Sequence, residues 1–131
     1  MNITVITTFR VSDIDAHRIS PAVLEIAVDP ERGRVAEDRL AFHAAAGNFR
    51  YVAEPTLDKF RVSVDQYTDL SHVKEALLEI AALDPHRIVD AFTIWDLIEE
   101  LQRQREETIA RKDTDAIEDD ISTGVYGNEY F

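Results

Sequence analysis

Histidine is the residue type in this chain best suited to acid–base or metal chemistry. The chain has four histidines: His17, His43, His72 and His86. No two of them have the close spacing that places two metal ligands on one face of a helix or strand. His72 and Glu75 lie three residues apart in one expected helix, and His86 and Asp90 lie four apart in the next. Each pair could supply two ligands or an acid and a base, but such pairs are also common on helix surfaces, and we expect the surface role.

Other catalytic features are weak in the sequence. His43 follows Phe42 in an alanine-rich stretch, where a single histidine is typical of a hydrogen-bonded core or boundary residue. The four glycines lack the spacing of a phosphate-binding loop, the serines lack the context of a nucleophile elbow, and no cysteine is present for thiolate chemistry. The sequence therefore predicts a protein that is not an enzyme and holds no metal or cofactor. A small enzyme that uses the histidine–carboxylate pairs is the alternative.

The acidic residues at positions 113–120 have the composition of a calcium ligand set. An EF-hand loop, however, needs glycine at its sixth position and a bidentate glutamate at its twelfth. Neither requirement is met in this segment, so we expect no dedicated calcium site.

Negative charge is the most unusual property of the chain. The formal net charge is −12, and residues 51–131 carry −11 of it. A surface of this sign repels the phosphate backbone of nucleic acids and the headgroups of anionic membranes, so direct binding to either is not expected. A negative face can instead imitate a phosphate backbone and attract a basic protein. A solvated surface that only keeps the protein soluble is the simpler interpretation.

The candidate negative face includes acids from the middle of the chain: Asp65, Asp69, Glu75, Glu79, Asp84, Asp90, Asp96, Glu99 and Glu100. Aromatic residues near the C-terminus could add interface anchors, although a terminal strand at a sheet edge would account for them equally well. We predict that the following residues contact the partner: Asp96, Glu99, Glu100, Asp113, Asp115, Glu118, Asp119, Asp120, Tyr126, Tyr130 and Phe131.

The elements that must position these residues are those of one α+β domain. A length of 131 residues fits a single domain with its own core. Alternating apolar residues predict strands at 2–11, 22–28, 49–54 and 58–65, and helical periodicity predicts helices near 36–46, 71–83 and 85–112. Strands followed by helices favour an antiparallel sheet packed against C-terminal helices. We expect this domain to span residues 1–112, with an acidic tail ending in aromatics at 113–131 that packs on its own domain or reaches a neighbour.

Several local signals refine this scheme. Residues 29–33 could begin a helix, with Asp29 as N-cap and Pro30 at the first position. We prefer a turn, because Gly33 can adopt the positive φ that closes a hairpin. Gly47 and Asn48 should end the following helix. Phe92 and Trp95 are expected in the core, packed on the hairpin sheet.

No basic and apolar leader precedes the first strand, and no apolar run reaches the roughly 20 residues of a membrane span, so we expect a cytoplasmic protein. In size and charge, though in no motif, the chain is similar to small acidic inhibitors, such as nucleic-acid-mimic proteins of phages and plasmids and immunity proteins against nuclease toxins. The leading hypothesis is a non-catalytic inhibitor or regulator that docks on a basic, nucleic-acid-handling protein. The alternatives are a structural or oligomer-forming accessory protein and the small enzyme that uses the histidine–carboxylate pairs.

Overall fold

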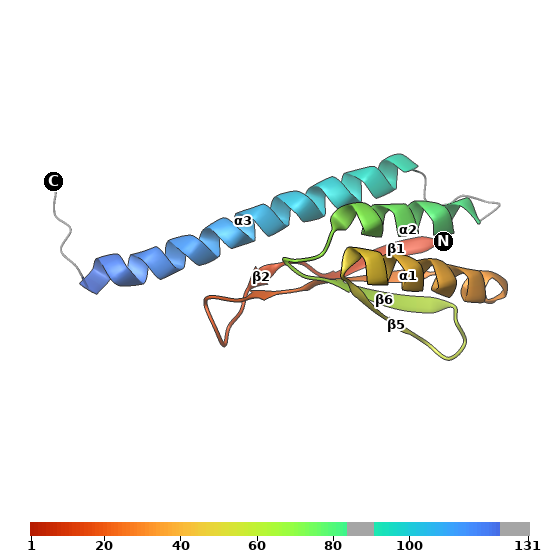
Figure 1. Ribbon diagram of the computed structural model, residues 1–131, viewed down its shortest axis with the longest axis horizontal. Coiled ribbons are helices and arrows are strands. Elements are labelled where there is room, and N and C mark those ends of the chain that lie inside the picture. Colours follow the sequence, from red (N-terminus) through yellow and green to blue (C-terminus); the bar gives the residue numbers. More distant parts are fainter. Residues whose placement is uncertain (84–90, 124–131) are drawn as a thin grey trace.

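In the computed structural model, four strands form one antiparallel sheet (Figure 1). Across the sheet they are β1 (Asn2–Thr7), β4 (Ala22–Ala27), β6 (Lys59–Val64) and β5 (Arg50–Ala53). The structure describes the backbone of residues 1–83 and 91–123 and the burial of side chains in residues 1–83 and 91–112. The strands predicted at 22–28, 49–54 and 58–65 are confirmed to within one residue at each end.

The segment predicted as one strand, 2–11, forms two strands in different sheets. β1 ends at Thr7, after a shift in its register with β4 between Val5 and Thr7. The chain then passes the buried residue Phe9 and forms β2 (Arg10–Val11), which pairs with β3 (Ile19–Ser20) in a separate two-stranded sheet. Such an irregularity bends a strand and increases its twist. Residues 2–11 therefore form two strands, although their apolar residues alternate without interruption.

Residues 29–33 begin a helix, so the predicted turn is wrong. A 3-10 turn (Pro30–Arg32) leads into α1 (Gly33–Gly47), and Gly33 itself has helical angles, with φ −60° and ψ −41°. A Cβ atom at Gly33 would lie 1.9 Å from the carbonyl oxygen of Leu57. Glycine is therefore needed for the close approach of α1 to the β5–β6 turn, and not for a positive φ.

Both predicted helix boundaries around residues 47–71 are confirmed. α1 ends at Gly47, and Asn48 follows in the left-handed conformation with φ 56°. α2 (Leu70–Ala82) begins after Asp69, whose carboxylate accepts a hydrogen bond from the Ser71 backbone N–H. Between these two caps the chain forms strands β5 and β6. α2 then packs beside α1 on the same face of the sheet (Figure 1).

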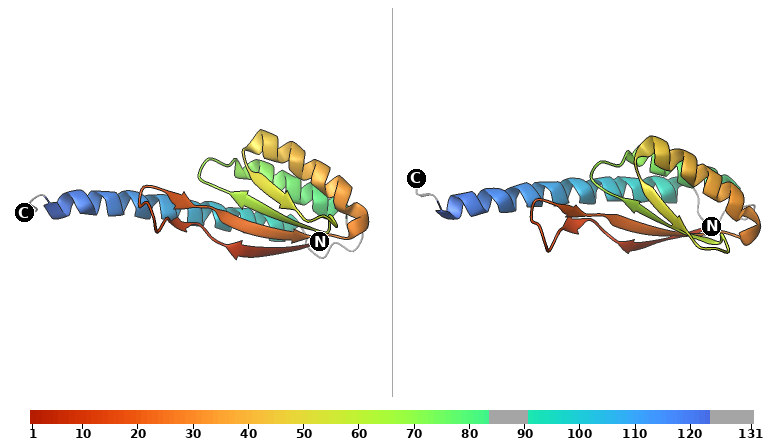
Figure 2. Two further views of the ribbon diagram at one scale, coloured as in Figure 1. Left: turned by 90° about the horizontal axis from the view of Figure 1, so that it is seen from below. Right: turned by 60° about the horizontal axis from the view of Figure 1, so that its bottom comes forward.

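The third helix, α3 (Ala91–Thr123), lies beside α2 and then over the β2–β3 hairpin. Beyond the hairpin it continues with no other described element alongside (Figure 2). Its predicted end near residue 112 is wrong, and its predicted start at residue 85 lies outside the described residues. None of the helices in the described part of the chain combines the length and the apolar composition needed to cross a bilayer.

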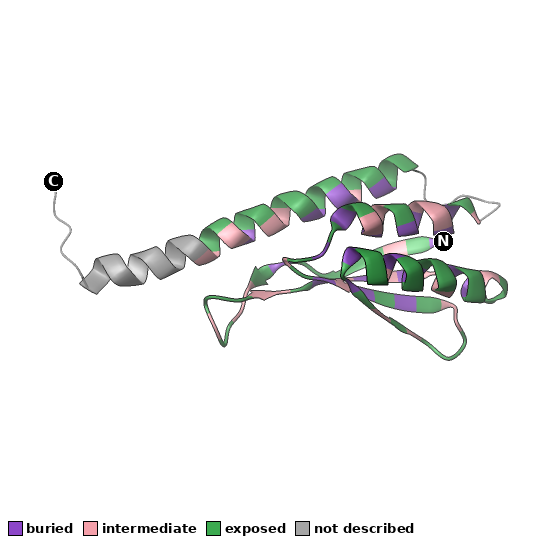
Figure 3. Ribbon diagram, viewed as in Figure 1, coloured by how far each residue is buried: buried purple, intermediate pink, exposed green. Residues whose placement is uncertain are grey.

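The core lies between the sheet and the helices. Alternate residues of β4 and β6 are buried, and the residues between them are partly or fully exposed (Figure 3). The largest fully buried side chains come from both layers: Leu24, Ile26, Phe60, Val62, Val64, Leu40, Val73, Leu77, Ile80, Ile94 and Leu101. This arrangement is the predicted α+β class, with an antiparallel sheet packed against helices.

Phe92 and Trp95 are not part of this core, contrary to the prediction. Phe92 is 71% exposed and Trp95 is 48% exposed. α3 instead packs through Ile94, Ile98 and Leu101. Because each residue advances about 100° around a helix, the side chains of Phe92 and Trp95 leave the helix well away from this buried line.

Candidate functional site

Three of the predicted partner-binding residues, Asp96, Glu99 and Glu100, lie on the exposed side of α3. The buried residues Ile94 and Ile98 fix the rotation of the helix about its axis. The three acids are consequently presented to solvent by the packing of the domain core.

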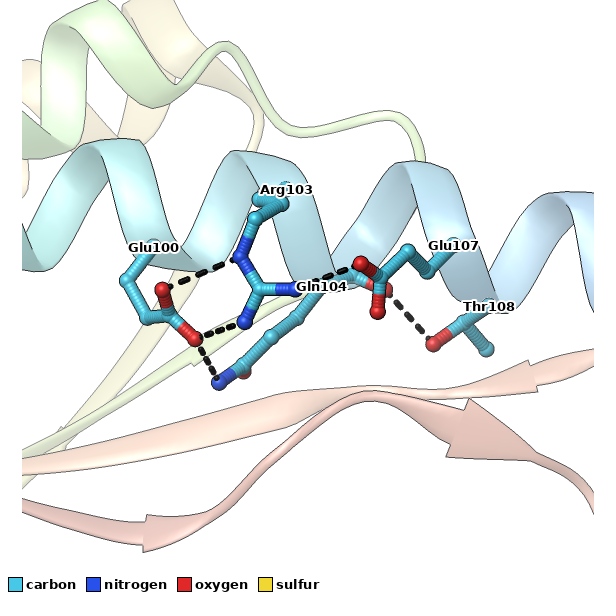
Figure 4. Close-up of polar contacts among 5 residues, drawn as sticks. All are labelled: Glu100, Arg103, Gln104, Glu107 and Thr108. Atoms are coloured by element: carbon cyan, nitrogen blue, oxygen red, sulfur yellow. Dashed lines mark hydrogen bonds and ion pairs between the residues drawn. The ribbon is translucent and has the colours of Figure 1, made fainter.

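Glu100 is bound by neighbours on its own helix (Figure 4). The Arg103 guanidinium donates two hydrogen bonds to the Glu100 carboxylate, one of them at 3.1 Å, and a further one to Glu107. Gln104 Nε2 donates to the same Glu100 carboxylate at 2.9 Å. The hydrogen bonds from Arg103 and then Gln104 lower the pKa of Glu100, and the two glutamates raise the pKa of Arg103. Part of the predicted negative face is therefore neutralised by an arginine.

Asp96 and Glu99 have no ion-pair or hydrogen-bond partner among the described side chains. Each acid lies about one helical turn after an aromatic residue, Asp96 four residues after Phe92 and Glu99 four after Trp95. The exposed rings of Phe92 and Trp95 meet edge to face with centroids 5.8 Å apart. A shallow hollow beside this pair is lined by Lys74 of α2 and, on α3, by Trp95, Ile98, Glu99 and Gln102. We call the set Phe92, Trp95, Asp96 and Glu99 the aromatic–acidic patch.

The structure places the remaining predicted partner residues only in part. Asp113, Asp115, Glu118, Asp119 and Asp120 belong to the helical backbone of α3, but their side chains are not described. Tyr126, Tyr130 and Phe131 lie outside the described residues, as do Asp84, His86 and Asp90.

Other acids of the predicted face have local structural roles. The Asp65 carboxylate accepts the Tyr67 N–H at 2.8 Å. The Asp69 carboxylate accepts the Ser71 hydroxyl at 2.6 Å and the Ser71 N–H at 3.0 Å, and these bonds lower its pKa. These two carboxylates therefore cap a turn and a helix end, and they stay exposed and negatively charged.

A second cluster forms between α1 and α2. His43 Nδ1 lies 3.1 Å from His72 Nδ1, and His43 Nε2 lies 3.0 Å from a carboxylate oxygen of Glu79. His43 is 2% exposed, His72 is half-buried, and Glu75 is exposed beside them. The ligand atoms of His43, His72 and Glu75 all lie within 4.8 Å of one another. The expectation that His43 is a hydrogen-bonded core residue is confirmed.

Gly47 explains why the two histidines meet. It ends α1 four residues after His43 and contacts the first turn of α2, where a Cβ atom on Gly47 would lie 2.5 Å from the Cβ of His72. The Asp69 N–H also donates to the Gly47 carbonyl at 2.8 Å. The C-terminal end of α1 is thus held directly against the N-terminal end of α2.

Sequence spacing did not reveal this cluster, because 29 residues separate His43 from His72. The signals that were present are the pair His72 and Glu75, three apart on one helix, and the glycine that ends the preceding helix. His17, by contrast, lies in the β2–β3 loop, where its N–H donates to Asp15, apart from the other described histidines. No protein-family model, curated protein or solved structure matches the chain.

Proposed function

We propose that the protein is a non-catalytic binding protein, an inhibitor or regulator of the nucleic-acid-mimic or immunity-protein type. It docks the exposed side of α3 on a basic protein that handles nucleic acid. The observation that carries this proposal is the aromatic–acidic patch, in which two exposed aromatic rings share one stretch of α3 with two carboxylates that have no partner among the described residues.

Aromatic side chains support the proposal because they contribute much of the binding energy at protein interfaces. Tryptophan in particular is enriched among the residues whose truncation costs most affinity. Trp95 offers about half of its surface to a partner, and Phe92 offers more. Exposure of two such rings to water is unfavourable, and a partner that buries them removes this cost.

The negative charge of the protein indicates that the partner is basic. The two carboxylates of the patch are part of a chain whose net charge is −12. Complementary charge accelerates association and selects a basic partner, and the effect weakens as salt screens it. Arg103 already binds Glu100 and Glu107, so Asp96 and Glu99 are the acids of this stretch of α3 that we expect a basic partner to contact.

Capture of binding proteins from cell extract at rising salt tests the proposal. The unaltered protein should retain basic proteins that are released as salt increases, and it should displace DNA or RNA from the captured protein once that is purified. Phe92→Ala/Trp95→Ala and Asp96→Asn/Glu99→Gln should each weaken capture. Asp13→Asn/Glu31→Gln is the matched control, because it removes the same charge from exposed sites elsewhere. Capture that ignores salt, or that survives both patch variants, contradicts the proposal.

Self-association is a second candidate, favoured by the part of α3 that extends beyond the β2–β3 hairpin (Figure 1). A helix that leaves its domain can pack against the same helix of another copy. Light scattering on the full chain and on a chain ending at residue 112 should then show an oligomer only for the full chain. A monomer in both cases removes this candidate.

A further inference from the structure

We propose that His43, His72 and Glu75 form a binding site for a divalent transition-metal ion, with zinc as the ion that suits it best. The site lies between α1 and α2 and is independent of the aromatic–acidic patch. The two proposals use different residues, so an experiment that contradicts one of them leaves the other untouched.

The separation of the two ring nitrogens fits a metal ion. Two nitrogen ligands that each lie about 2.0–2.1 Å from a tetrahedral zinc ion are about 3.3–3.4 Å apart. His43 Nδ1 and His72 Nδ1 are 3.1 Å apart, so a shift of a few tenths of an ångström would admit the ion between them. Without an ion, one of these nitrogens must carry a proton that it donates to the other.

Glu75 supplies a third ligand of the right chemistry. Its carboxylate lies one helical turn after His72, on the same side of α2, with a ligand atom within 4.8 Å of those of both histidines. Two imidazoles and a carboxylate suit zinc and its neighbours in the first transition series better than calcium or magnesium, which prefer oxygen ligands. Because Glu75 is exposed and His72 half-buried, the ion can enter from solvent and keep a water molecule as its fourth ligand.

Glu79 orients the imidazole ring of His43 through a hydrogen bond. Metal-bound histidines almost always donate their other ring N–H to a carboxylate or carbonyl, which fixes the tautomer and orients the ring. His43 Nε2 lies 3.0 Å from Glu79, and the Arg39 guanidinium lies 3.7 Å from the other Glu79 oxygen. This hydrogen bond places the proton on Nε2 and leaves the lone pair of His43 Nδ1 directed at His72.

Zinc titration of the chelator-treated, full-length protein tests the site. Calorimetry or competition with a chromophoric chelator should show one ion bound per chain, and Co²⁺ should give the intense visible bands of a four-coordinate site. His72→Ala and Glu75→Gln should each lower the affinity at least tenfold, and Glu79→Ala should lower it about 10–100-fold. His43→Ala is less suitable because the residue is buried, so its half-buried partner His72 carries the test.

Two controls separate this site from other acids and histidines. His17→Ala removes an exposed histidine, and Asp119→Asn/Asp120→Asn removes two acids of α3; both variants should bind zinc as the unaltered protein does. Circular dichroism should show that every variant is folded. The proposal is overturned if no saturable binding occurs, if His72→Ala binds zinc normally, or if either control abolishes binding. In each of those cases the two histidines are only a hydrogen-bonded pair.

Discussion

A Cβ atom on Gly47 would lie only 2.5 Å from the Cβ of His72, so the end of α1 and the start of α2 are in direct contact there. This contact sets the distance between the helices that carry His43 and His72. The histidine cluster therefore depends on a residue that has no side chain, and the packing at this point can be tested by adding one.

Gly47→Ala should destabilise the protein by about 1–3 kcal/mol, the usual cost of overpacking a close contact. At an ordinary helical position the same change stabilises a protein by up to about 1 kcal/mol, so the sign of the effect identifies the contact. Urea unfolding gives the free energy. A double-mutant cycle with His72→Gly should recover part of the loss, and the absence of any coupling would contradict the contact.

Ile94→Ala and Trp95→Ala should differ sharply although the residues are adjacent in sequence. Ile94 is fully buried, and its truncation should cost about 2–5 kcal/mol. Phe92→Ala, at an exposed site, should change the free energy of unfolding by no more than about 0.5 kcal/mol, and Trp95→Ala should cost far less than Ile94→Ala. Chemical denaturation of the three variants compares them. Equal losses at Ile94 and Trp95 would mean that α3 is rotated from the orientation described.

Asp69→Ala should cost about 0.5–2 kcal/mol by removing the N-cap of α2, whereas Asp69→Asn should be nearly neutral, since asparagine caps equally well. The difference between the unaltered protein and Asp69→Asn should depend on pH. The Ser71 hydrogen bonds lower the pKa of Asp69 from its ordinary 3.8, so the carboxylate contributes its full stabilisation above that pH. The contribution is lost as the pH falls through the lowered value. Thermal unfolding between neutral and acid pH measures this, and a parallel decline in both proteins would contradict the role of Asp69.

Arg103→Gln should raise the pKa of Glu100 toward its ordinary value, because Arg103 is the main cause of its lowering. The substitution also exposes more negative charge beside the aromatic–acidic patch, and so should strengthen salt-sensitive binding to a basic partner. Carboxyl chemical shifts followed by NMR during a pH titration report the pKa directly. Arg111→Gln removes the same charge further along α3 and serves as the control. An unchanged titration of Glu100 in Arg103→Gln would contradict the hydrogen bonds between them.

Local sequence patterns determined most of the elements and several of their ends. Alternation predicted β4, β5 and β6, and residue chemistry predicted the end of α1 at Gly47 and Asn48. These features depend on interactions within a few residues. The strongly negative composition likewise belongs to the sequence alone, and it directs the proposed function toward a basic partner.

Tertiary packing decided the rest. Position 33 requires glycine because the chain at Leu57 passes beside it, and Ile94, rather than Trp95, points into the core because of where α2 lies. His43 and His72 meet only because two helices far apart in sequence touch at Gly47. Short-range patterns cannot encode such distances, since they are fixed by the shapes of surfaces that come together only when the whole chain folds.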